Sequence, residues 1–201
     1  MSPHDVLLER SAKAFGFGGR LVRLALPDGH VHLSVDLDEG EHLRRSRAGL
    51  GAITDWELVA AMWELPHAVA VPQSSIPSEV LAVIEQAPVS AVELAGGSVL
   101  RKSCPPLTVS GAFVVGDKLE RLLRRVGQMS AIASMAVVVR REVDPSDPWM
   151  LNAALYGVGV AVSAHGDLTP VSEPEPVTPT LGPFMWWVAE KAYEQVAGAV
   201  R

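Results

Sequence analysis

Two histidines and two aspartates alternate along one predicted strand and could together hold a divalent metal ion. His30, His32, Asp36 and Asp38 stand at even-numbered positions of the stretch 30–38, and residues two apart in a strand point to the same side. Imidazole and carboxylate groups are ligands for Zn²⁺, Fe²⁺ or Mn²⁺. A metal held there would activate water for hydrolysis. The alternative is a solvated polar face, because the odd-numbered residues of this strand are all apolar.

Acidic residues continue into the next segment at Glu39 and Glu41. Either carboxylate could complete the ligand shell of the His/Asp site, and the whole acidic cluster could bind Mg²⁺ through oxygen. The alternative is the solvated start of a charged segment. The sequence leaves both interpretations open.

Motifs for nucleophilic catalysis are weak in this sequence. It contains no Gly-x-Ser-x-Gly or His-Glu-x-x-His pattern, and these are the signatures of a serine nucleophile and of a zinc protease. The single cysteine, Cys104, precedes two prolines and has no histidine near it in the sequence, so a thiolate nucleophile gains no support. One cysteine cannot form an intramolecular disulfide, which favours a reducing cytoplasm.

The net charge of −6, from 17 basic and 23 acidic residues, disfavours a nucleic-acid partner, because such proteins need a broad basic surface. Arginines cluster at 44–47, 124–125 and 140–141. They would form a phosphate-binding surface if the fold gathered them, so that partner stays open. No segment has the features of a secretion signal or the roughly 18 apolar residues of a membrane span. We therefore expect a cytoplasmic protein without membrane contact.

Alternating strands and amphipathic helices follow one another along the 201 residues, of which 48% are apolar. This order predicts an α/β fold with a mixed central sheet flanked by helices. We expect a single α/β domain over 1–172, a Pro-rich tether over 173–183 and a C-terminal docking helix over 184–201. The strand–helix–hairpin pattern of 67–105 returns at 136–174, which suggests a weak internal repeat.

Tryptophan makes up five of the eleven aromatic residues, and two helices carry most of them. A helix at the end of a Pro-rich tether must dock on its own domain or on another chain. Tryptophan and tyrosine are also the residues that dominate binding at protein interfaces. The predicted interface residues are Trp56, Trp63, Phe184, Trp186, Trp187 and Tyr193.

The stretch 54–106 contains a Trp-bearing helix ending before Pro66, a short strand followed by Pro72, another helix and a hairpin over 90–103. This order resembles the later part of the restriction-endonuclease-like PD-(D/E)XK nucleases. The resemblance implies that the hairpin 20–38 occupies the place of the catalytic strands. That family carries an acid on one strand and acid-x-Lys on the next.

In this sequence the hairpin carries Asp28, Asp36 and Asp38 but no lysine at the required place. The resemblance therefore implies a nuclease-like fold with a degenerate catalytic motif. The leading functional hypothesis is a non-catalytic binding or assembly module that needs no cofactor. Such a module would engage a protein partner, or itself as a homo-oligomer, through the Trp-bearing helices. The alternative hypothesis is a metal-dependent hydrolase, which could be nuclease-like, that uses the His/Asp site on strand 30–38.

Overall fold

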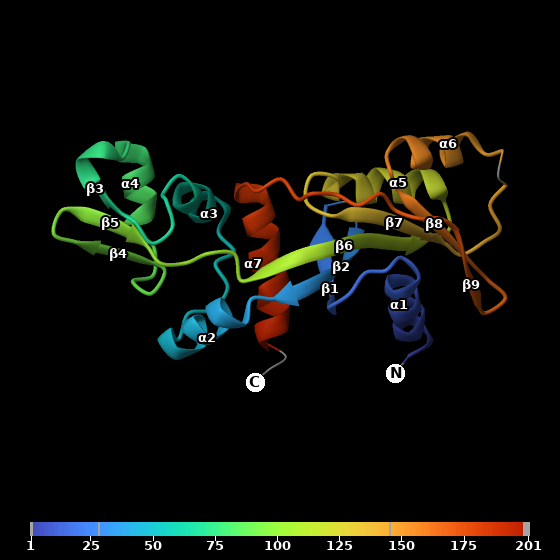
Figure 1. Cartoon of the computed structure of the whole chain (residues 1–201), viewed down its shortest axis with the longest axis horizontal. Coiled ribbons are helices and arrows are strands. Elements are labelled where there is room, and N and C mark those ends of the chain that lie inside the picture. The colour runs from blue at the N-terminus through green and yellow to red at the C-terminus, as the bar shows by residue number, and fades with distance from the viewer. Residues whose placement is uncertain (1, 28, 145, 199–201) are drawn as a thin grey trace. The chain divides into compact units, whose positions relative to one another are not determined.

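A computed structural model describes residues 2–27, 29–144 and 146–198 as an α/β protein with two sheets (Figure 1). The helices are α1 (Pro3–Ala14), α2 (Glu39–Ala48), α3 (Trp56–Trp63), α4 (Ser78–Ile84), α5 (Leu119–Val126), α6 (Pro148–Leu155) and α7 (Pro183–Gly198). The strands are β1 (Arg20–Leu26), β2 (Gly29–Leu37), β3 (Ala70–Pro72), β4 (Val92–Ala95), β5 (Ser98–Arg101), β6 (Leu107–Gly116), β7 (Ser134–Val139), β8 (Gly159–Ala164) and β9 (Asp167–Ser172).

The chain divides into two compact units, each assembled from two separate stretches of sequence. Unit 1 comprises 1–36 and 109–180, and unit 2 comprises 37–108 and 181–201. The sequence analysis did not anticipate this division. None of the helices in the described residues is long and apolar enough to cross a membrane.

Unit 1 is built on the mixed sheet that the sequence predicted. Its six strands lie in the order β1-β2-β6-β7-β8-β9. The hairpins β1–β2 and β8–β9 are antiparallel, whereas β6, β7 and β8 run parallel. Helices α5 and α6 connect these parallel strands and cover one face of the sheet, and α1 covers the other face (Figure 1). The predicted helices on both sides of a mixed sheet are therefore confirmed.

Apolar contacts hold α1 on its face of the sheet. Phe15, at the end of α1, belongs to a buried cluster with Phe113 of β6, Ala136 of β7 and other strand residues. Phe17 lies directly over Gly111, where any larger residue would collide with the Phe17 ring. The close approach to the sheet of the segment between α1 and β1 thus depends on a residue without a side chain.

The Pro-rich segment after β9 is extended and lies along unit 1. Backbone N–H groups of Glu175, Val177 and Thr180 donate hydrogen bonds to Gly157 O (2.9 Å), Ser134 Oγ (3.1 Å) and Ala131 O (2.8 Å). These bonds anchor most of the segment before α7 begins. The predicted division into 1–172, 173–183 and 184–201 stays a prediction, and residues 199–201 of its last part lie outside the described residues.

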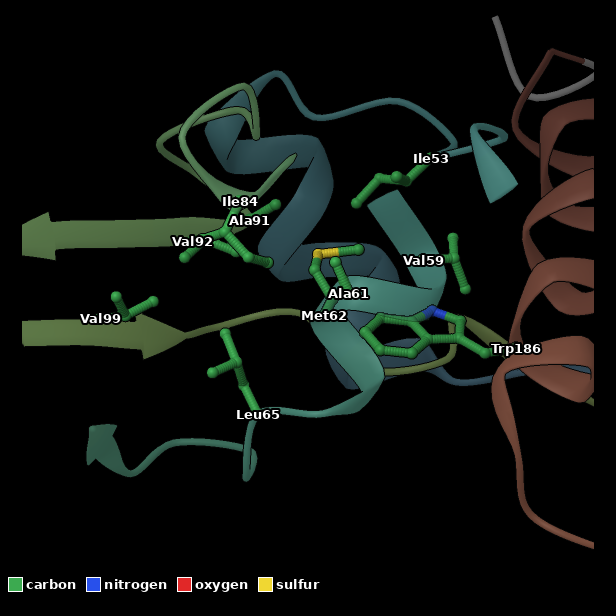
Figure 2. Close-up of a cluster of buried hydrophobic side chains, with 10 residues drawn as sticks. All are labelled: Ile53, Val59, Ala61, Met62, Leu65, Ile84, Ala91, Val92, Val99 and Trp186. Atoms are coloured by element: carbon green, nitrogen blue, oxygen red, sulfur yellow. The ribbon is translucent and has the colours of Figure 1, made fainter. Parts of the chain in front are cut away.

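Unit 2 contains a second, smaller sheet in the order β3-β5-β4, with both pairings antiparallel. A buried apolar cluster joins this sheet to α3, α4 and α7, and Figure 2 shows Met62 of α3, Val99 of β5 and Trp186 of α7 within it. The two segments of the suggested repeat differ in pairing, because β3 pairs antiparallel with β5 whereas β7 pairs parallel with β8.

A buried group of charges connects α2 to α7 inside unit 2. Arg45 is completely buried and donates from Nε to Glu41 Oε1 at 2.6 Å. Its Nη1 and Nη2 donate to the two carboxylate oxygens of Glu190 at 2.7 and 2.6 Å. Glu190 is also buried and accepts hydrogen bonds from Ile53 N and Trp186 Nε1. Every charge in this group has a partner of opposite sign.

A second arginine, Arg44, also pairs with Glu41 and donates hydrogen bonds to both of its carboxylate oxygens at 2.7 and 2.8 Å. Burial by itself raises the pKa of Glu41, but the hydrogen bonds from Arg44 and Arg45 outweigh it and lower that pKa below its ordinary value. Glu41 therefore contributes stability above the ordinary carboxyl pKa, and the contribution is lost as pH falls through its lowered folded value.

Replacing Glu190 by glutamine is expected to destabilise the protein by about 3 kcal/mol, because it removes one of the two negative charges that pair with the buried Arg45. The measurement is the urea midpoint of unfolding followed by circular dichroism. Glu194→Gln is the matched control on the same helix, since Glu194 is exposed and 4.0 Å from Lys191. A Glu190→Gln midpoint equal to that of the control would contradict this account.

Candidate functional site

The structure separates the four residues of the predicted metal site. His32 is buried, stacks on Phe113 with ring centroids 5.3 Å apart and meets the His4 ring edge-on at 6.0 Å. His30, two residues earlier on β2, is exposed, and its Nδ1 lies 3.1 Å from Arg23 Nη2. Around His32, α1 therefore covers the face that the alternative interpretation placed in solvent.

The two aspartates of the predicted metal site do not lie together with the histidines either. Asp36 is exposed, and Asp38 caps α2 by accepting from Glu41 N at 2.8 Å. Across the ranges that the structure describes, no group of three or more His, Cys, Asp or Glu side chains is placed to hold a metal ion. Asp28, which the nuclease resemblance singled out, lies outside those ranges.

Burial of the His32 ring lowers its pKa from 6.5 to about 4, and nearby His4, Arg23 and His30 add to the shift. The folded protein thus holds His32 neutral at a pH where an unfolded chain would protonate it. Between about pH 6.5 and 4 the unfolded state binds the extra proton, so this site lowers stability progressively as pH falls.

We expect His32→Phe to lose less thermal stability than the wild type between neutral pH and about pH 4.5, because an uncharged ring replaces one that resists protonation. The melting temperature at each pH is the measurement. His165→Asn serves as the control, because His165 is exposed in the turn between β8 and β9 and is not among the groups that act on His32; it should retain the wild-type pH dependence. Parallel curves for the wild type and His32→Phe would show that His32 is not the titrating group.

Cys104 is partly buried, next to the ion-pair group. Its carbonyl oxygen accepts from Arg45 Nη2 at 3.0 Å. The pKa of the Cys104 thiol is raised to about 11, mainly by burial. The carboxylates of Glu41 and Asp38 also raise this pKa, and the nearby arginines lower it by less. Because the thiolate is the nucleophile, this environment disfavours a catalytic role.

The Cys104 thiol is expected to react with Ellman's reagent at about pH 8 roughly a hundredfold more slowly than free cysteine, owing to its small thiolate fraction. The same chain unfolded in urea is the control and should react at the ordinary rate. Fast reaction of the folded protein would overturn the assignment of Cys104 as a structural thiol.

Three aromatic side chains form a surface cluster on unit 2, which we call the aromatic patch: Trp56 of α3 and Phe184 and Trp187 of α7. Trp187 meets Trp56 edge-on at 6.3 Å and stacks with Phe184 at 6.2 Å. Its indole Nε1 donates to Thr54 O at 2.9 Å, which fixes the central ring. Trp56 and Phe184 remain 46% and 37% exposed.

The other predicted interface residues lie inside unit 2. Trp186 is fully buried under the guanidinium of Arg101, and Trp63 is its edge-on neighbour at 6.4 Å. Tyr193 is buried, with its hydroxyl 2.9 Å from His42 Nδ1. Trp186 and Tyr193 therefore offer almost no surface to a partner, whereas Trp63 is only partly buried.

The sequence analysis did not identify one residue that contacts the aromatic patch. Lys191 lies 6.0 Å from the ring of Trp187. Its place one helical turn after Trp187 is the signal that could have indicated this contact.

Several of the arginines that the sequence considered for a phosphate-binding surface bind carboxylates instead. Arg124 pairs with Glu120 at 2.7 Å, and Arg140 pairs with Asp117 at 3.1 Å. Arg45 is held in the buried group described above. Such pairing reduces the charge that these side chains present to solvent.

Comparisons with protein-family models, with curated proteins and with solved structures found no match to this chain. The aromatic patch is therefore interpreted from its own geometry. The resemblance to PD-(D/E)XK nucleases stays a prediction.

Proposed function

We propose that this protein is a non-catalytic cytoplasmic module that binds another protein chain through the aromatic patch. The observation that carries the proposal is the exposure of Trp56 and Phe184 beside a Trp187 ring that is already fixed. The cytoplasmic location is part of the proposal and is supported by the single cysteine of the sequence.

Fixed aromatic rings are effective binding groups for two reasons. They remove a large apolar area from water when a partner covers them. They also lose little conformational freedom on binding, because neighbouring rings already hold their orientation. The contacts of Trp187 with Trp56, Phe184 and Thr54 meet this second condition. The patch thus has the composition and rigidity of an interface hot spot.

A second copy of this chain is the partner that we favour. Identical apolar patches can face each other across a two-fold axis without any need for complementary charge. The other form of the proposal is a different protein, whose apolar helix face would cover the same aromatic patch. In either form Trp56 and Phe184 become buried on binding.

The double variant Trp56→Ser/Phe184→Ser is expected to weaken self-association at least about tenfold, the effect of losing more than about 1.4 kcal/mol of apolar contact. Sedimentation equilibrium of the full chain over a micromolar concentration series measures the dimer dissociation constant. Both side chains also pack on Trp187, so the melting temperature of the variant is measured to confirm that it is folded under the conditions of the experiment.

Leu151→Ser/Leu155→Ser is the matched control, since these α6 residues in unit 1 are even more exposed. It should associate like the wild type. A wild-type chain that stays monomeric at every concentration would remove the self-association form. Equal weakening in both double variants would show that the patch has no special role.

The alternative metal-dependent hydrolase gains no supporting observation in the described residues. It would need His30, His32, Asp36 and Asp38 to converge, whereas His32 packs under α1 and Asp38 caps α2.

A further inference from the structure

Unit 2 contains a cavity of about 750 Å³ that is widely open to solvent and whose polar lining is dominated by basic side chains. Arg44 of α2, His67 before β3 and Lys102 after β5 contribute the charged and imidazole groups. The apolar wall includes Val89 and Leu100. This volume lies within the range of small-molecule sites in proteins.

The charge of the cavity differs from that of its surroundings. Unit 2 has more acidic than basic residues, yet none of the residues that line the cavity is acidic. Arg44 and Lys102 pair with Glu41 and Glu93, which lie outside the lining, so an anion would be recognised here by the remaining N–H groups of these two cations rather than by a net positive charge.

Two of these basic groups retain hydrogen-bond donors. Lys102 Nζ has three N–H groups and donates to Glu93 at 3.2 Å. Arg44 uses Nε and Nη2 for Glu41 and Ser103, and Nη1 for Ser90 O. One Nη1 hydrogen of Arg44 and two hydrogens of Lys102 thus remain for a ligand.

The wall at His67 and Ala68 is held in place before any ligand binds. Ala68 has a φ of 59°, in the left-handed region that residues other than glycine rarely adopt. Its N–H donates to Arg101 O at 2.9 Å, and His67 Nε2 lies 3.3 Å from Lys102 O. Strained backbone that persists because its surroundings hold it is concentrated at binding sites.

We propose that this cavity binds a small amphipathic carboxylate. The carboxylate accepts hydrogen bonds from Lys102 and Arg44, and the apolar body of the ligand covers Val89 and Leu100. Charged hydrogen bonds position the head group, while the apolar wall gives the affinity of area removed from water. This site is separate from the aromatic patch and does not depend on the proposed association.

Octanoate is the probe, titrated into the ¹⁵N-labelled full chain up to about 20 mM, a range that detects weak binding. Saturable amide shifts are expected at Ala68, Ser90 and Lys102. Lys102→Gln should raise the octanoate dissociation constant about tenfold, because one charged hydrogen bond is lost. Val89→Asp, which places a carboxylate beside the site, should abolish the saturable shifts.

Arg47→Gln is the matched control, because it removes one positive charge from the exposed surface of α2 outside the cavity lining. It should bind octanoate like the wild type. Octanol, with the same chain but no charge, should bind at least about tenfold more weakly.

The proposal is overturned if octanoate causes no saturable shifts, or if the shifts gather elsewhere. It is equally overturned if octanol binds as well as octanoate, or if Arg47→Gln weakens binding as much as Lys102→Gln does. The amide spectra of the variants without ligand show directly that each one is folded.

Discussion

Arg45 has no contact with water, and the interior of unit 2 is organised around giving its guanidinium two carboxylates. Moving an arginine out of water is costly unless its charge and its N–H groups are satisfied. Glu41 on the same helix and Glu190 on α7 supply the charge, and Cys104 O accepts one further hydrogen bond. The bidentate pair with Glu190 fixes the rotation of α7 about its axis. That rotation buries Trp186 and Tyr193 and leaves Phe184 at the surface.

Most helices and strands could be predicted because their signals are local. Asp55 and Asp147 cap α3 and α6 by accepting backbone hydrogen bonds, a preference that belongs to the residue type, and the predicted hairpin 20–38 contains β1 and β2. The assignment of strands to two sheets could not be predicted in the same way. Pairing of β3 with β5 joins residues about thirty positions apart, and periodicity within one strand carries no information about its distant neighbour.

The same distinction between local signals and distant contacts applies to the candidate sites. The sequence located Trp56, Phe184 and Trp187 by residue type, but it could not separate them from Trp186 and Tyr193, because the partner of Glu190 lies 145 positions away. It likewise placed His32 on a polar face, since nothing near that residue indicated that α1 would cover it. The basic cavity went unnoticed because Arg44, His67 and Lys102 belong to three separate elements.

The same ion pair has a consequence for the order in which the chain can fold during synthesis. All of unit 1 has been made once residue 180 is added, whereas Arg45 meets its second carboxylate only when Glu190 emerges. At about 5–20 residues per second, the 145 positions between them take on the order of 10–30 s. Throughout that interval, the helix that carries Arg45 has Glu41 but not Glu190. The closing of unit 2 therefore comes after all of unit 1 has been synthesised, and the position of a single glutamate sets its timing.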